Sequence, residues 1–359
     1  MSKIISGIQQ IGIGIPHVHE AWKWYRQNFG MDIPIFEEAA EANLMLPYTG
    51  GKPQQRHAIL ATNLQGGGGM EIWQYTSRTP QPPEFQPQLG DLGIFVARMK
   101  CIDVDSLYAK FTQTRNKRDV LNKVSQDPSG KRHFFVRDPY GNIFQPVEAN
   151  NWFTDGPHLT GGPEGVMIGV SDIDKARVVY SDILGYDTVV YDKEGVFEDF
   201  AGLPGGDAKV QRVLLKHSQP RKGGFSRIFG PSHIELVRAL DREPKKIFEN
   251  RFWGDLGFIH LCFDIFGMDE LREECAQKGH PFTVDSSAAM GTVFDMGEAA
   301  GLFSYIEDPD GTLIEFVETH KVPILKKLGW YLNMKKRNPE KPLPDWMLKA
   351  LSFNRVKDK

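Results

Sequence analysis

Carboxylate and imidazole side chains stand inside apolar, strand-like segments in the second half of this chain. Glu235 and Glu315 each lie between two large apolar residues, and His260 lies in the apolar run 258–263. His233, two residues before Glu235, would share one face of a strand with it. Such groups either face solvent, or form hydrogen bonds in a core, or are buried because they bind something, since burying an unpaired charge is costly. Their chemistry would be the binding of a divalent metal and the transfer of protons.

The elements that must position these residues come from an internal repeat. The matching segments are 21–32 with 176–187, 90–93 with 254–257, and 138–142 with 308–312. The first pair aligns without a gap, and both members of the last pair carry the pattern Asp-Pro-x-Gly. Because the matched pairs keep the same order along the chain, they indicate two homologous halves.

Each half divides into two units, for which the pattern predicts one strand, a helix and then three strands. In the first unit, the alternation over 10–15 predicts a strand, and Gly30 ends the helix that follows. Asp103 and Asp172 stand where they can accept hydrogen bonds from the first backbone N–H groups of later helices. The Asp-Pro-x-Gly segments predict tight turns before a last strand. The later units are expected over 92–147, 165–237 and 258–317.

Composition excludes several classes of function. With 359 residues, 40% hydrophobic and 25% charged, the chain is expected to form two globular domains. A net charge of −3 gives no field that favours nucleic acid, and no segment is apolar for long enough to span a bilayer. Cys101, Cys262 and Cys275 are far apart, which argues against disulfides and fits a reducing compartment. We therefore expect a cytoplasmic protein with a small-molecule substrate or ligand, and without a nucleic-acid or membrane partner.

Two segments resemble the vicinal-oxygen-chelate superfamily, which includes the glyoxalases, the bleomycin resistance proteins and the extradiol dioxygenases. Residues 170–185 resemble its first helix and the turn before it, and residues 303–315 resemble its final hairpin. The resemblance implies an α+β fold in which four βαβββ modules pair into two cup-shaped mixed-sheet barrels. The expected divisions are an N-terminal domain over 1–152, a C-terminal domain over 160–320, and a basic, helical tail over 321–359. The tail is expected to dock on its own domain or on the partner in a homodimer.

The resemblance also implies where a metal would be held, because the ligands of this superfamily come from the first and last strands of each unit. The corresponding positions are Gln10, Val96, Gly165 and His260 in first strands, and Glu71, Gln145, Glu235 and Glu315 in last strands. The units are expected to pair in chain order, so that the C-terminal cup holds Glu235, His260 and Glu315, with Gly165 where a fourth ligand would stand. The N-terminal cup then holds Glu71 as its one strong ligand, and we expect it to be free of metal or nearly so.

The implied function is that of a metalloenzyme. The predicted triad of Glu235, His260 and Glu315 resembles the glyoxalase I set of one Gln or His, two Glu and one His, with the first member absent. It shares His260 and Glu315 with the extradiol dioxygenase set of two His and one Glu. One divalent ion (Zn, Ni, Mn or Fe(II)) would stabilise an oxyanion on a substrate with vicinal oxygens, in lyase, isomerase or dioxygenase chemistry.

The resemblance also gives these residues roles in catalysis. Glu235 or Glu315 would act as the general base. His233 would replace the missing ligand, hold a ligand in place through a hydrogen bond, or carry protons. The alternative function is a metal-free protein of the same fold that binds or sequesters a small molecule.

Overall fold

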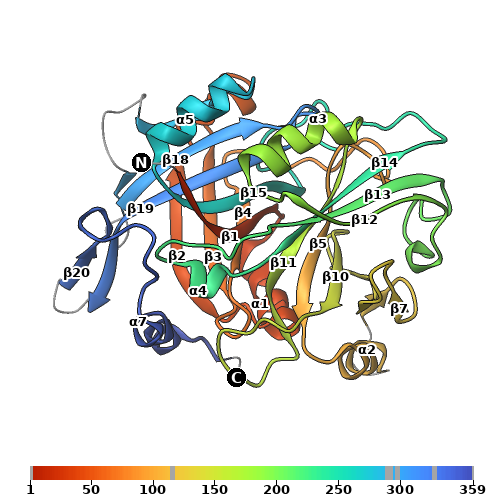
Figure 1. Cartoon of the computed structure of the whole chain (residues 1–359), viewed down its shortest axis with the longest axis horizontal. Helices are drawn as coiled ribbons and strands as arrows, with labels where there is room; N and C mark the ends of the chain where they lie inside the picture. Colours follow the sequence, from red (N-terminus) through yellow and green to blue (C-terminus); the bar gives the residue numbers. More distant parts are fainter. Residues whose placement is uncertain (1–2, 114–117, 288–293, 296–299, 326–329, 358–359) are drawn as a thin grey trace.

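Two curled mixed sheets form the frame of the protein, with few helices around them (Figure 1). The computed structural model describes residues 3–113, 118–287, 294–295, 300–325 and 330–357. The expected α+β class with two curled sheets and helices in the C-terminal tail is confirmed.

The first sheet has the strand order β16-β18-β19-β15-β1-β4-β3-β2. Its strands are β1 (Ile4–Gly14), β2 (Ile33–Glu41), β3 (Gln55–Thr62), β4 (Gly69–Tyr75), β15 (Gly257–Phe266), β16 (Val284–Asp285), β17 (Phe294–Asp295), β18 (Ala300–Glu307), β19 (Leu313–Leu325) and β20 (Trp330–Asn333). Strand β17 pairs with β18, and β20 pairs with β19.

The second sheet has the order β12-β13-β14-β11-β5-β10-β8-β7. Its strands are β5 (Gly93–Cys101), β6 (Asp119–Val120), β7 (Ser125–Gln126), β8 (Arg132–His133), β9 (Val136–Arg137), β10 (Ile143–Glu148), β11 (Thr160–Gly169), β12 (Thr188–Gly195), β13 (Val210–Lys216) and β14 (His233–Ala239). The helices are α1 (Val18–Phe29), α2 (Val104–Thr112), α3 (Ile173–Arg177), α4 (Ser226–Phe229), α5 (Met268–Gln277) and α7 (Asp345–Lys349). Short helical turns are η1 (Leu46–Tyr48), η2 (Val178–Ile183), η3 (Glu198–Phe200), η5 (Met334–Lys336) and η6 (Ala350–Asn354).

We had expected the units to pair in chain order, but the structure shows a different pairing. Strand β1 of the first unit pairs antiparallel with β15 of the fourth, so these two units share the first sheet. Strand β5 of the second unit pairs with β11 of the third, so these two share the second sheet. The segment 76–92 carries the chain from β4 in one sheet to β5 in the other. Because each first strand has a similar alternating pattern, local sequence does not decide which one it pairs with.

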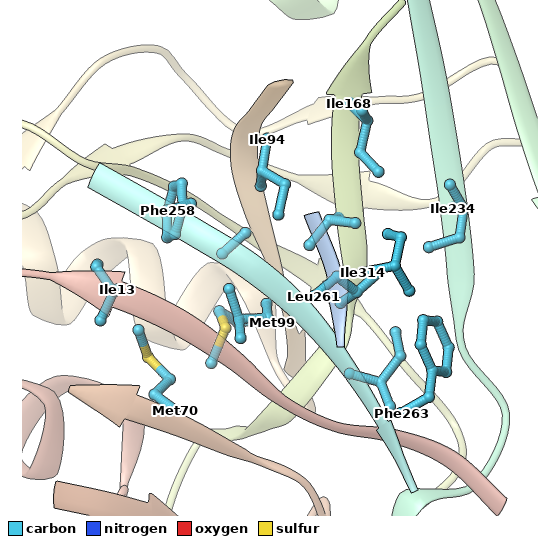
Figure 2. Close-up of a cluster of buried hydrophobic side chains, with 14 of the residues drawn as sticks. Ile13, Met70, Ile94, Met99, Ile168, Ile234, Phe258, Leu261, Phe263 and Ile314 are labelled. Atoms are coloured by element: carbon cyan, nitrogen blue, oxygen red, sulfur yellow. The ribbon is translucent and has the colours of Figure 1, made fainter. Parts of the chain in front are cut away.

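A common apolar core joins the two sheets. Figure 2 shows Ile13 and Leu261 of the first sheet in one cluster with Met99, Ile168 and Ile234 of the second. Because side chains alternate along a strand, the residues between these positions point into each curled sheet. The interior of the first sheet is mainly aromatic, whereas that of the second is aliphatic and phenylalanine-rich.

The C-terminal tail docks on its own chain. Strand β20 extends the first sheet, so this part of the tail is a strand and not a helix. Leu343 and Leu348 pack with Ile33 in a separate apolar cluster, and Arg355 binds Asp32 at 2.7 Å. Among the described residues, no helix has the length and apolar character needed to cross a bilayer.

Candidate metal centre

The first curled sheet brings four potential ligands together. Gln10 lies on β1, Glu71 on β4, His260 on β15 and Glu315 on β19, and these four strands are neighbours in the order β19-β15-β1-β4. All four side chains are buried. Gly12 stands opposite His260 and beside Glu71 in the strand register. A Cβ atom at Gly12 would lie 2.4 Å from the imidazole, so the space for the ring depends on this glycine.

The distances suit coordination of one ion. The Nε2 atom of His260 lies 3.3 Å from Glu71 Oε2 and 3.1 Å from Glu315 Oε2. The Nε2 atom of Gln10 lies 3.5 Å from Glu315 Oε2. Ligand atoms of Glu71, His260 and Glu315 are all within 4.8 Å of one another. Donors bound to one zinc-like ion at about 2.1 Å lie about 3 to 4.2 Å apart, so the side chains need only small shifts.

Buried atoms without a hydrogen-bond partner support the same reading. Although His260 Nε2 is close to two carboxylate oxygens, it makes no well-aligned hydrogen bond with either. The Oε1 atom of Gln10 is also buried without a partner. Buried polar atoms are rarely left unsatisfied in proteins. An imidazole nitrogen, an amide oxygen and two carboxylates form a donor set that a divalent ion would satisfy in charge and in coordination.

The charges at this centre are strongly coupled. Burial alone would lower the pKa of His260, but the carboxylates of Glu315 and Glu71 outweigh it and raise that pKa to about 10. Burial would raise the pKa of Glu315, yet His260, Tyr305 and Cys262 hold it below its ordinary value. Without an ion, the centre therefore contains an imidazolium between carboxylates. A divalent cation would replace that proton as the compensating charge.

An aromatic wall surrounds the centre. The indole of Trp253 stacks on the His260 ring with a centroid distance of 6.2 Å, and Tyr305 meets that ring edge-on at 5.7 Å. Trp253 also lines a cavity of about 550 Å³. The side chains of Glu71 and Glu315 keep 11% and 10% of their surface accessible, so solvent reaches the carboxylates. The centre is therefore enclosed but not sealed.

The predicted ligand set is not brought together as a whole. His260 and Glu315 lie side by side, but Glu235 lies in the second sheet, and Glu71 occupies the position we had expected it to take. Glu235 accepts hydrogen bonds from Arg98 Nη1 at 2.7 Å, Arg212 Nε at 2.7 Å and Tyr191 Oη at 2.8 Å. The difference follows from the pairing of units, since Glu235 belongs to the third unit and shares its sheet with the second.

His233 is also away from the centre. Its Nδ1 atom contacts Glu164, which accepts a second contact from Arg98 Nε at 2.9 Å. Gly165 cannot host a ligand side chain, because a Cβ there would lie 1.8 Å from the backbone oxygen of His233. The interior of the second sheet, the second cup, thus holds a network of ion pairs around Glu235, the position that corresponds to a candidate ligand of the first cup.

Comparison with known proteins agrees with this architecture. Residues 162–316 match the family model of the Glyoxalase/Bleomycin resistance protein/Dioxygenase superfamily. A mutant of glyoxalase I from Zea mays is similar over 88% of this chain and 92% of its own, with 13% identity and a TM-score of 0.55. A provisionally named dioxygenase from Bacillus subtilis subsp. subtilis str. 168 is similar over 100% of this chain and 99% of its own, with 14% identity and a TM-score of 0.56. No curated protein sequence matches the chain.

At these identities, the structural likeness concerns the fold alone. It extends over nearly the whole chain, whereas the family model covers its second half. Residues 162–316 thus carry a domain of the glyoxalase/bleomycin resistance protein/dioxygenase superfamily, and the two curled mixed sheets give the whole chain a fold similar to that of the solved structures.

Proposed function

We propose that this chain is a metal-dependent enzyme that acts on a small molecule with vicinal oxygens, by lyase or isomerase chemistry based on proton transfer. The observation that carries the proposal is the convergence of Gln10, Glu71, His260 and Glu315 on one point, with buried donor atoms that lack partners. This set has the composition of the glyoxalase I ligand set that the sequence resembled: one Gln, two Glu and one His.

The ligand set favours this chemistry over a dioxygenase reaction. An extradiol dioxygenase would need two imidazoles and one carboxylate, as in the facial triad of non-haem iron enzymes. In the part of the chain that the structure describes, the centre offers one imidazole, His260, and two carboxylates, which suit zinc, nickel or manganese as well as iron(II). A metal-free binding role has less support, because it leaves Gln10 Oε1 buried without a partner and needs a proton on His260 to offset the two carboxylates.

Residues of the chain would then have separate roles in catalysis. A bound divalent ion supplies positions for two adjacent substrate oxygens and stabilises the negative charge that develops on them. Glu315 keeps the role of general base, accepting a proton from the neighbouring carbon, because its carboxylate is held ionised. Glu71, the other carboxylate at the centre, is the second candidate for this role. Trp253 and Tyr305 fix the imidazole plane of His260 and limit the access of water.

Metal analysis combined with an exchange assay tests this proposal. Protein purified without chelators and exposed to zinc, nickel, manganese and iron(II) is expected to retain an ion at this centre, and His260→Ala is expected to lose it. The loaded protein should exchange the proton on the hydroxyl-bearing carbon of 2-hydroxyketones with deuterated water, as followed by NMR. Glu315→Gln should stop the exchange. Failure to retain any of the four metals at the centre would overturn the proposal.

Metal affinity is expected to rise with pH. Since the pKa of His260 is about 10 in the metal-free fold, an ion must displace a proton from this ring near neutral pH. Affinity should increase about tenfold per pH unit between about pH 6 and about pH 9. Competition against a chelating dye at several pH values measures the slope, and calorimetry in buffers of different ionisation enthalpy counts the released protons. A flat profile would contradict the assignment of His260 as a ligand.

The stability of the metal-free protein should depend on pH in the opposite sense. The pKa of His260 is raised from 6.5 in the unfolded chain to about 10 in the fold. The charged imidazole therefore stabilises the metal-free fold fully below about pH 6.5, and this contribution is lost as the pH rises toward about 10. Thermal unfolding after chelator treatment should follow this trend, and His260→Ala should flatten it.

A further inference from the structure

We propose a second metal site on the outer face of the first sheet, formed by His19, Glu37 and His57. His19 lies in the first turn of α1, Glu37 on β2 and His57 on β3. The Nε2 atoms of His57 and His19 lie 3.0 Å and 3.4 Å from Glu37 Oε1. Their ligand atoms all lie within 4.8 Å of one another. Two imidazoles and one carboxylate form a set for a divalent transition metal such as zinc, with positions left for water.

This cluster is separate from the inner centre. Glu37 pairs across the strands with Ile59, which belongs to the core on the outer face of the sheet beneath α1. Leu60, the next residue along β3, pairs with the inner ligand Glu71. Because neighbouring residues on a strand point to opposite faces, the two clusters lie on opposite sides of one sheet.

A hydrogen bond between His57 and Glu37 does not account for the whole geometry of the cluster. A neutral imidazole donating to Glu37 would explain the 3.0 Å contact of His57. It does not explain why a second imidazole, with 63% of its side chain exposed, approaches the same oxygen and meets His57 edge-on at 5.2 Å. Ordering an exposed side chain costs rotamer entropy, and a long contact to an already paired oxygen returns little. A shared ion would account for the convergence of both rings.

The exposure of the cluster makes it easy to test. Glu37 and His57 keep 42% and 24% of their side-chain surface accessible, so an ion from solvent reaches them, and substitutions should not disturb the core. A bound ion would tie the start of α1 to the hairpin of β2 and β3. Zinc should therefore raise the unfolding temperature as well as bind.

The experiment uses the full chain without an affinity tag and titrates it with zinc chloride alone. In a His260→Ala background, which removes the inner centre, one zinc per chain is expected to remain. His19→Ala or His57→Ala in that background should weaken binding at least about tenfold, and Glu37→Gln should act in the same direction. His17→Ala is the matched control, because it removes an exposed histidine two residues from His19 that is not in the cluster.

The outcomes separate this site from the proposed function. Zinc that remains in His260→Ala and leaves in His57→Ala supports the outer site even if the inner centre proves empty. If His260→Ala does not fold, the comparison is made in the parent chain, where two zinc ions are expected and His57→Ala should retain one. Zinc binding and unfolding temperature that are the same in His57→Ala as in its parent would overturn the proposal.

Discussion

Replacing Glu71 by glutamine is expected to abolish retention of the inner ion, whereas replacing Glu235 by glutamine should leave that ion bound. The reason is the strand pairing: Glu71 Oε2 lies 3.3 Å from His260 Nε2, while Glu235 is in the other sheet and bonded to Arg98 and Arg212. Losing one charged ligand of four should weaken binding by at least about 100-fold, since even supporting residues behind a ligand are worth about 10- to 100-fold. Metal content after dialysis and competition with a chelating dye measure the difference.

Matched variants sharpen this comparison. Glu315→Gln should lose the ion whichever units pair, so it serves as the positive control. Gln10→Ala discriminates further, because Gln10 lies at the centre only if the first and fourth units share a sheet; we expect a loss of about tenfold for this neutral ligand. Circular dichroism at low temperature ensures that each variant is folded. Retention of the ion in Glu71→Gln together with its loss in Glu235→Gln would mean that the ligands come from units paired in chain order.

The repeated fold was predictable because its signals are local. Asp103 and Asp172 accept hydrogen bonds from the backbone N–H groups of Ser106 and Lys175, as the sequence predicted for helix N-caps. Gly30 ends α1 in the left-handed conformation, with φ of 64°. These features depend on a few neighbouring residues, and a single sequence carries them in full.

The matched segments also indicate a long-range contact. This contact is not the pairing of sheets that we inferred from them. Tyr25, in the first repeated helix, donates to Asp138 in the first Asp-Pro-x-Gly turn at 2.7 Å, and Tyr180 donates to Asp308 in the second at 2.8 Å. The repeat thus records a helix-to-turn contact between consecutive units. It does not show which sheet each strand joins. In the structure, the first unit shares a sheet with the fourth and the second with the third.

The candidate centre was missed in part for this reason. All eight positions lie on first or last strands, as predicted, but they were divided between cups by chain order, which left Gln10 and Glu71 on one side and His260 and Glu315 on the other. Pairing the first unit with the fourth divides the same eight positions into one set with four donors and one with only two, Gln145 and Glu235. Comparing both pairings for a complete ligand set would have found it from the sequence, whereas the neutralisation of Glu235 by Arg98 and Arg212 depends on contacts that no local pattern carries.

Replacing Arg98 by methionine is expected to lower the free energy of unfolding by about 3–5 kcal/mol. Arg98 is fully buried, and it binds Glu164 through Nε at 2.9 Å and Glu235 through Nη1 at 2.7 Å. Its removal leaves two buried carboxylates with fewer positive partners. Such a change lowers stability more than replacing the entire network by apolar groups does. Urea unfolding followed by circular dichroism measures the loss. Arg132→Met is the control, because its pair with Asp105 is exposed and solvent screens it, so its unfolding curve should match the parent.

The double variant Arg98→Met with Glu235→Leu tests whether the loss arises from an unpaired charge. Arg212 would keep Asp199 as a partner at 2.8 Å, and Glu164 would keep His233, so fewer charges would be stranded. Its loss of stability should therefore be clearly smaller than the sum of the two single losses, because the two residues are coupled. Simple additivity, or no loss in Arg98→Met, would contradict the role of this network.

The two cups differ in how they compensate the negative charge of buried carboxylates. Each buries a carboxylate on its last strands, and the second cup compensates Glu235 with two guanidinium groups, one of which also lies 3.8 Å over the ring of Phe200. Among the described residues, the ion-pair partner given for both Glu71 and Glu315 in the first cup is His260 and not an arginine, so a divalent ion is the natural compensation for the two carboxylates. Arg98→Met should accordingly change stability without changing metal content, since Val96 and Gly165 offer no ligands to an ion in the second cup. A gain or loss of bound metal in Arg98→Met would contradict the assignment of metal binding to the first cup and of a stabilising ion-pair network to the second.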